Sequence, residues 1–305
     1  MQLRLKNGAS LCLSLAMMLS CLSLGCKSSA HPFDQFPIRK QTKYFDFHYE
    51  RNSPQIEGTA RFADAYVRIV DRDFFPADFN YPIQVYVLAN SSRFENFVQR
   101  DLKVPGPAGY GIYLYAHKLL ATYESSGLGT FTHESMHAFV ERDLSSRPAW
   151  ADEGIPTFFE KFYGYWKGDE LVLYWGFQNP WRIEALGPDL TRLNLAEIVS
   201  DASMERDESQ LRMVSLFLWR QGKFRRFLRR IAANDKGGFS SYLEAAMDMQ
   251  FENIIPLWQS YLRDVEQHRT EILSLPLSTV CRSEEEFQNF AKVNGISTDQ
   301  VVQAE

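Results

Sequence analysis

Strand and helix patterns alternate over residues 43–125. Phe45, Phe47 and Tyr49 alternate with polar residues, and this period of two predicts a strand. The segment Y-P-I-Q-V-Y-V-L-A is rich in β-branched and aromatic residues, which favour strands. The predicted order is strand, helix, strand, helix and hairpin, over residues 43–50, 59–75, 81–89, 92–100 and 109–123.

Helical patterns dominate after Gly127 and Gly129. Thr130 can cap a helix that contains T-H-E-S-M-H-A-F-V, and W-A-D-E-G-I-P-T-F-F-E predicts a second helix that returns beside it. Further helices are predicted over residues 190–200, 210–232 and 240–262, with a short strand at 170–175. The whole pattern predicts an α+β fold, in which a small mixed sheet precedes a mainly helical C-terminal part.

The N-terminal segment predicts export. Arg4 and Lys6 stand in a start without acids, and residues 9–25 are almost wholly apolar or small, as in a signal peptide. A transmembrane anchor is the alternative, although a run of about 17 residues is at the lower limit for a span. L-S-L-G-C resembles a bacterial lipobox with Cys26 as the lipidated residue, and Cys21 is a weaker candidate. We expect a protein of the bacterial cell envelope, held at a membrane surface by lipid on Cys26, with plain secretion as the alternative.

Composition narrows the class of protein. The chain has 305 residues and a formal net charge of −5, which disfavours a nucleic-acid partner. Of its four cysteines, three lie in or next to the signal peptide and Cys281 is alone near the C-terminus. No disulfide is expected in the lipidated protein, so its stability depends on its core.

Two histidines in the motif H-E-S-M-H have the spacing of a metal-binding helix. His133 and His137 are four residues apart and therefore lie on one helix face, one turn apart. Glu134 lies about 100° around the helix, where a carboxylate can reach water at the metal without binding the metal. A solvated helix with two surface histidines is the alternative.

A catalytic zinc ion keeps three protein ligands and one open position, so two histidines need a partner. Glu153 follows after a spacer of fifteen residues, within the helix that is predicted to return beside the first. We therefore predict His133, His137 and Glu153 as metal ligands and Zn²⁺ as the cofactor. The same donors also suit cobalt or manganese.

The two motifs together, H-E-x-x-H and W-x-x-E-G, resemble those of the gluzincin metallopeptidases. That resemblance implies a zincin-like fold, zinc-dependent cleavage of a peptide or protein substrate, and Glu134 as the general base. It also makes Glu153 the third ligand. Asp152 matches the residue before that ligand, and it can accept the ring N–H of His137. The order of elements over residues 44–262 resembles exported bacterial proteins of the peptidase MA-like kind.

The sequence pattern and the resemblance together predict one division of the chain, and several roles stay open. The division is a signal peptide (1–25), a tether (26–42), a zincin-like domain (43–265) and a helical tail (266–305). Within the domain, we expect a strand-rich part (43–126), two active-site helices (127–165) and a helical part (182–265). Candidates for the residue that stabilises the oxyanion are Tyr123, Tyr163, Tyr165 and Arg212.

Other interpretations of the same residues also remain. The spacer is shorter than in the best-known gluzincins, and no tyrosine begins the later helix. A zinc-binding surface protein without activity, or a metal-free lipoprotein, is therefore the alternative to a peptidase. The hairpin over 109–123 either binds substrate along its edge or belongs to the core. Glu141, Asp143 and Glu160 are expected on solvated helix faces. The sequence does not predict the oligomeric state.

Overall fold

The computed structural model describes six stretches of the chain, which are residues 32–75, 81–107, 109–144, 148–200, 207–233 and 237–297. A first unit, Met1–Gln35, contributes the short 3-10 helix Pro32–Gln35 (η1), and a second unit, Phe36–Glu305, holds all the other elements. The predicted signal peptide, Cys26 and the start of the predicted tether lie outside the described residues. In the described part of the chain, no helix has the length and apolarity needed to cross a membrane.

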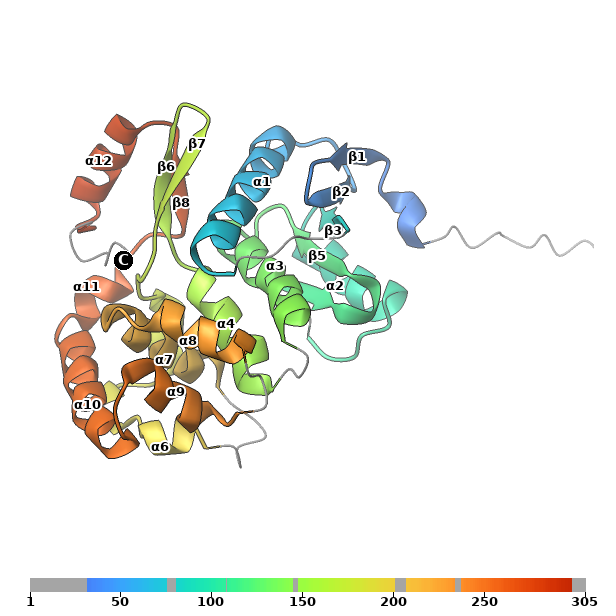
Figure 1. Ribbon diagram of the computed structural model, residues 1–305. Coiled ribbons are helices and arrows are strands. Elements are labelled where there is room, and N and C mark those ends of the chain that lie inside the picture. Colours follow the sequence, from blue (N-terminus) through green and yellow to red (C-terminus); the bar gives the residue numbers. More distant parts are fainter. Residues whose placement is uncertain are drawn as a thin grey trace, which may run out of the picture. The chain divides into compact units, whose positions relative to one another are not determined.

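Five strands form a mixed sheet in the order β1-β2-β3-β5-β4 (Figure 1). They run over Ile38–Gln41 (β1), Phe45–Tyr49 (β2), Ile83–Leu88 (β3), Gly111–Leu114 (β4) and Leu119–Tyr123 (β5). The three central strands are parallel, and each outer strand is antiparallel to its neighbour. The predicted hairpin is present, with a 3-10 turn, Tyr115–His117 (η3), between β4 and β5.

Strand β1 corrects the predicted tether, which extends to residue 42. This edge strand alternates between partly buried and exposed residues and pairs with β2. Arg39 also donates a 2.7 Å hydrogen bond from Nε to Oδ1 of the buried Asp46. Three of the four side chains of this edge strand are polar, so its sequence carries no hydrophobic period.

Helices cover both faces of the five-stranded sheet. On one face, the aromatic rings of Phe45 and Phe47 pack against Phe131 of helix α3 (Leu128–Asp143), next to helix α1 (Ile56–Asp73). The other face is covered by α2 (Ser91–Asn96) and the π-helical turn Phe97–Asp101 (η2). The alternating apolar residues of β2 and the helical spacing of those in α1 predict the first of these two contacts and not the second.

The rest of the chain is mainly helical. Helix α4 (Ala149–Phe159) packs against α3 and against α7 (Glu208–Arg220). A Cβ on Gly154 would lie 3.2 Å from Leu211, so glycine permits the close approach of α4 and α7. The remaining helices are Pro180–Ala185 (α5), Leu190–Arg192 (η4), Leu195–Ile198 (α6), Phe224–Ala233 (α8), Phe239–Met247 (α9), Phe251–Gln267 (α10), Arg269–Leu273 (α11) and Glu284–Val293 (α12). The α+β class is thus confirmed.

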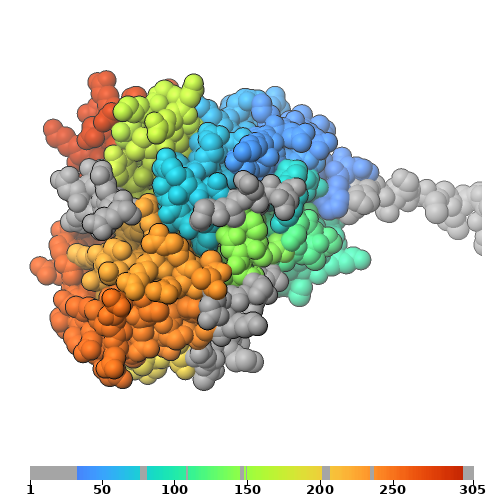
Figure 2. Space-filling model, in the orientation of Figure 1, coloured from blue at the N-terminus to red at the C-terminus, as the bar shows by residue number. Residues whose placement is uncertain are grey.

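A second sheet joins the middle of the chain to its C-terminal part. Tyr163–Lys167 (β6) pairs with Glu170–Tyr174 (β7) on one side and, in parallel, with Thr279–Cys281 (β8) on the other. Figure 2 shows this hairpin, in yellow-green, beside the C-terminal residues, in red, and helix α12 contacts β6. The C-terminal part therefore differs from the predicted helical tail, because one of its segments is a strand of a sheet.

Candidate metal centre

Helix α3 places the H-E-S-M-H motif at a buried position. It begins directly after Gly127, whose φ of 89° is a conformation that favours glycine. His133, Glu134 and His137 are all less than 9% exposed. The alternative of two surface histidines is therefore wrong, and the polar side chains of this helix need partners inside the protein.

The two histidines meet Glu153 of the returning helix α4. The ligand atoms of the three side chains lie within 4.8 Å of one another. Oε2 of Glu153 is 3.6 Å from Nε2 of His133 and 3.9 Å from Nε2 of His137. Ligands of a tetrahedral zinc ion are about 3.4 Å apart, and the two separations from Glu153 are within about half an ångström of that value. Two nitrogens and one carboxylate oxygen are also a common catalytic donor set.

The other ring nitrogen of His137 is held by a tyrosine. Nδ1 of His137 lies 2.9 Å from the hydroxyl of Tyr115, and that hydroxyl donates to Oδ1 of Asp152. The predicted acceptor Asp152 is itself 3.6 Å from Nδ1, so Tyr115 connects the two groups. When Nδ1 carries the proton, Nε2 keeps a free lone pair on the side of Glu153. This tautomer can bind a metal through Nε2.

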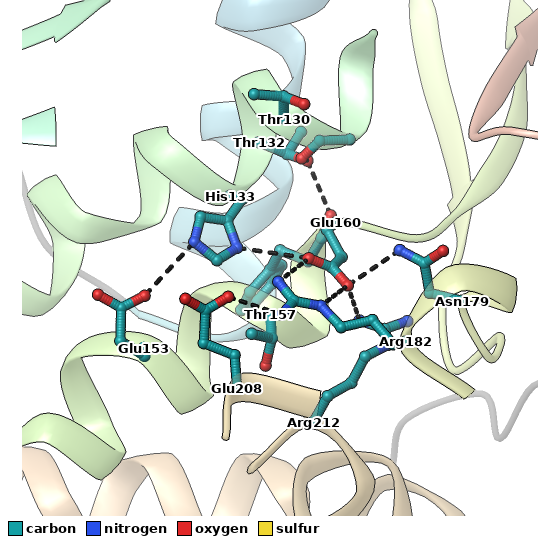
Figure 3. Close-up of polar contacts among 12 residues, drawn as sticks. Thr130, Thr132, His133, Glu153, Thr157, Glu160, Asn179, Arg182, Glu208 and Arg212 are labelled. Carbon is teal, nitrogen blue, oxygen red and sulfur yellow. Dashed lines mark hydrogen bonds and ion pairs between the residues drawn. The ribbon is translucent and has the colours of Figure 1, made fainter. Parts of the chain in front are cut away.

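An acid faces the corresponding nitrogen of His133. Nδ1 of His133 is 3.5 Å from Oε2 of Glu160, and Figure 3 shows the imidazole between Glu160 and Glu153. The contact is an ion pair that is slightly too long for a formed hydrogen bond. Glu160 is 7% exposed, so the expectation that it lies on a solvated helix face is wrong. Both histidines thus turn Nδ1 towards a polar partner and Nε2 towards Glu153.

Glu160 belongs to a buried network of charges. Arg182 of α5 donates to both of its carboxylate oxygens, each at 2.9 Å, and also pairs with Glu208 at 2.6 Å. The side-chain amide of Asn179 donates to the same carboxylate at 3.0 Å. Burial opposes ionisation of Glu160, but the contact with His133 and the charge of Arg182 outweigh burial and lower its pKa well below the usual range. Glu160 is therefore a stable anion behind His133.

Small residues and hydroxyls bring the end of α4 against α3. The carbonyl oxygen of Glu160 would lie 2.3 Å from a Cβ on Gly129, so only glycine fits there. The hydroxyl of Thr132 donates to the carbonyl of Phe159 at 2.8 Å. The hydroxyl of Ser278, which directly precedes β8, donates to the carbonyl of Glu160 at 2.9 Å. These contacts hold Glu160 beside His133.

Burial changes the acidity of the first two side chains of the motif, His133 and Glu134. It raises the pKa of Glu134, although the neighbouring histidines act in the opposite direction. Burial lowers the pKa of His133, but Glu153 and Glu160 outweigh burial and raise the pKa to about 10 in the protein without a metal. Oε2 of Glu134 is 3.9 Å from Nε2 of His137, so this carboxylate lies beside the three ligands.

A cleft of about 960 Å³ opens over this cluster. One wall is β4, whose Gly111 would place a Cβ 2.7 Å from Cγ of Glu134. The lining also includes residues of α5, the start of α7 and the segment before β8. Among the described strands, β4 pairs only with β5, and residues of this outer strand line the cleft.

The structure brings together His133, His137 and Glu153, places Glu134 beside them and places Asp152 within reach of His137 through Tyr115. Among the described residues that line the cleft, the four predicted oxyanion candidates (Tyr123, Tyr163, Tyr165 and Arg212) do not occur. Sequence reasoning missed Tyr115, Arg182 and the role of Glu160. One feature of the sequence indicates the role of Glu160. It stands seven residues after Glu153 and therefore on the same side of the second predicted helix.

Comparison with family models and with curated proteins finds no match to this chain. The residues of the cleft and their geometry are therefore the basis for a functional proposal.

Proposed function

We propose that this chain is a zinc-dependent peptidase of the gluzincin type, exported to the bacterial cell envelope and tethered there through Cys26. One observation carries the proposal. Two imidazole nitrogens and one carboxylate oxygen converge beside a buried Glu134, within a cleft that is bordered by a strand edge. A structural zinc site closes its fourth position with protein and needs no adjacent base.

The donor set fits zinc. Nε2 of both histidines and Oε2 of Glu153 would hold the ion, while Tyr115 and Glu160 fix the ring orientations from behind. A bound zinc ion supplies a water of lowered pKa, about 7, and polarises a substrate carbonyl. Cobalt or manganese would also bind these donors in vitro.

Glu134 is proposed as the general base. Its carboxylate is beside the ligand cluster and is buried, so it can take a proton from water in the cleft and pass it to the leaving amine. Burial raises the pKa of this carboxyl in the protein without a metal. Its reach is limited on one side by Gly111, which packs directly against it.

Strand β4 is proposed to bind the substrate backbone. An extended peptide can add to its outer edge, because main-chain N–H and C=O groups there have no partner strand among the strands that the structure describes. Such a peptide would run past Glu134, since Gly111 of β4 contacts this residue.

The proposal is tested by metal content and hydrolysis measured on the same protein. We expect one zinc ion per chain after gentle purification, and cleavage of an unstructured peptide library that a chelator abolishes and added zinc restores. Glu153→Gln is expected to lower zinc affinity at least about 100-fold, because a ligand is lost. Glu184→Gln is the control, since Glu184 is exposed and outside the cleft. Equal zinc content in the two variants would contradict the site.

Gly111→Ala tests how closely Glu134 must be placed. The added methyl group would meet Cγ of Glu134 at 2.7 Å and Cγ2 of Thr130 at 2.8 Å, so the carboxylate must move. A displacement of about 1 Å can lower a rate about 100-fold, and we expect a loss of this order in kcat/KM with zinc content retained. Gly58→Ala in α1 is the matched control, because a Cβ there meets nothing within 4 Å. Equal rates for the two variants would contradict the packing argument.

A binding protein without activity is the second candidate. It is favoured by the absence of the predicted oxyanion candidates from the described lining of the cleft. Such a protein would bind zinc and peptide but would release every peptide uncut. The chelator experiment on the peptide library separates these two candidates.

A further inference from the structure

Helix α8 has one apolar side and one basic side. Its apolar side is buried and recurs at helical spacing; it consists of Phe224, Phe227, Leu228 and Ile231. The positions between these residues are all arginines, namely Arg225, Arg226, Arg229 and Arg230. The helix contains no acid. Because the apolar side packs into the core, the four arginines lie on the outer side of the helix.

The end of helix α1 lies beside α8 and adds two arginines. Phe74 directly follows α1, and the centre of its ring is 6.4 Å from that of Phe224 (Figure 1). Arg68 and Arg72 are exposed and stand one helical turn apart on α1. We call the six arginines of the two helices the basic face: Arg68, Arg72, Arg225, Arg226, Arg229 and Arg230.

Half of the positive charge of the basic face is uncompensated. Three acids interact with it, which are Asp73, Asp248 and Glu170. Arg68, Arg229 and Arg230 form no ion pair with any other residue of the described chain. The whole chain has a formal net charge of −5, so this face is a local region of the opposite sign.

The arginines of the basic face repel one another. Burial lowers the pKa of Arg225, Asp73 acts in the opposite direction, and the charges of Arg229 and Arg72 lower it further. Guanidinium groups bind phosphate oxygens through two parallel hydrogen bonds, and bound phosphates would remove the repulsion. The basic face therefore fits a partner that presents several phosphate groups side by side.

The basic face does not border the cleft. No described residue of α1 or α8 is among those that line it. Helix α8 packs on α4 through two ring pairs, Phe224 with Phe158 at 4.2 Å and Phe227 with Trp150 at 6.1 Å. Around α4, positions 150 and 158 point about 60° and about 140° away from Glu153, so α8 and this metal ligand lie on different sides of the helix. A broad partner can thus cover the basic face and leave the cleft open.

The proposed tether favours a membrane as this partner. Cys26 and Phe36, where the large unit begins, are ten residues apart, and a chain of that length spans at most about 36 Å. Lipid on Cys26 would keep the folded domain within this distance of the bilayer, where a high effective concentration strengthens weak contacts. Anionic lipids attract basic surfaces and repel acidic ones, so the basic face is the side that would turn to the bilayer.

We infer that the basic face binds the anionic phospholipid headgroups of the membrane that holds the chain. This contact orients the domain on the membrane with its cleft open to substrate. The inference goes beyond the proposed peptidase activity and uses only the proposed tether. It extends that tether from a single lipid attachment to a second, electrostatic contact made by the folded domain.

The test is sedimentation with vesicles, using the chain that begins at Lys27, which carries no lipid and keeps every described residue. We expect the wild type to bind vesicles with about one third phosphatidylglycerol but not vesicles of phosphatidylcholine alone. Binding should disappear between about 0.1 M and about 1 M salt, because the Debye length falls from about 10 Å to about 3 Å. Arg229→Gln with Arg230→Gln should lower the partition coefficient about 25-fold, which is about fivefold for each arginine.

The control removes the same charge outside the basic face. Arg192→Gln with Arg282→Gln changes two exposed arginines and should leave vesicle binding nearly unchanged. Both double variants should unfold near the wild-type midpoint, because exposed substitutions have small effects on stability. No binding to anionic vesicles, or equal losses in the two double variants, would overturn the inference. Tighter binding of the wild type to polyglutamate than to vesicles would assign the face to an acidic protein partner and would also overturn it.

Hydrolysis of a soluble peptide by the same preparations separates this inference from the proposed function. Since the basic face does not border the cleft, kcat/KM of the zinc-loaded Arg229→Gln/Arg230→Gln variant should equal that of the wild type. Vesicle binding by a chain that cuts no peptide would support the basic face and contradict the peptidase proposal. Cleavage without vesicle binding would do the reverse.

Discussion

Glu134→Gln is expected to lower kcat/KM for a cleaved peptide by about 10²- to 10⁴-fold, with one zinc ion per chain still bound. Glutamine has nearly the same shape as glutamate and cannot accept the proton of water. The three ligand atoms belong to other side chains, so the metal site keeps its donors. Zinc content by mass spectrometry and initial rates on one peptide are measured on the same preparation.

Two outcomes of this experiment have different meanings. Retained zinc with undiminished hydrolysis would remove Glu134 as the base. Loss of zinc would mean that this carboxylate binds the ion directly, although it is not one of the three side chains whose ligand atoms lie within 4.8 Å of one another. Glu184→Gln is again the control for a glutamate-to-glutamine change at an exposed position.

Arg182→Met is expected to lower the free energy of unfolding by about 3–5 kcal/mol, because it leaves a buried carboxylate without its main partner. Arg182 and Glu160 are 6% and 7% exposed, and two hydrogen bonds of 2.9 Å join them. Arg212 cannot replace the lost donors, since its nearest nitrogen is 3.7 Å from the carboxylate. Urea unfolding in the presence of a chelator measures this effect without a contribution from bound metal.

Arg192→Met is the matched control for the stability experiment. Arg192 pairs with Asp189 at 3.0 Å, but its side chain is 85% exposed. Exposed ion pairs contribute about 0–1 kcal/mol, so this variant should unfold near the wild-type midpoint. Similar losses in the two variants would mean that burial of the Glu160 network contributes little to stability.

The elements with strong local patterns were predictable. Phe45, Phe47 and Tyr49 indicate the buried strand β2 by their alternation, and the H-E-S-M-H spacing places two histidines on one face of α3. Glu153 was predicted as a ligand because a catalytic zinc ion needs a third protein ligand and the next helix was expected to return beside the first. Helix α4 does return beside α3. Local periodicity and ligand chemistry were sufficient for each of these predictions.

What could not be predicted depends on tertiary packing. Glu160 directly follows helix α4, and its local sequence is as compatible with solvent as with a buried partner. Arg182 comes from a separate helix 22 residues later. Tyr115 reaches His137 only because β4 and α3 lie side by side. Strand β8 has three residues, and its neighbouring segment bonds to Phe162 across 116 positions, so no local period indicates it.

The origin of one cleft wall in the segment before β8 has a consequence for biosynthesis. A ribosome adds Leu277 and Ser278 long after the histidines and Glu153 have left the exit tunnel. During translation, an apolar cleft wall and the hydroxyl that bonds the carbonyl of Glu160 are therefore still missing. A nascent chain that already contains all three metal ligands therefore cannot yet form the complete cleft, which needs almost the entire polypeptide.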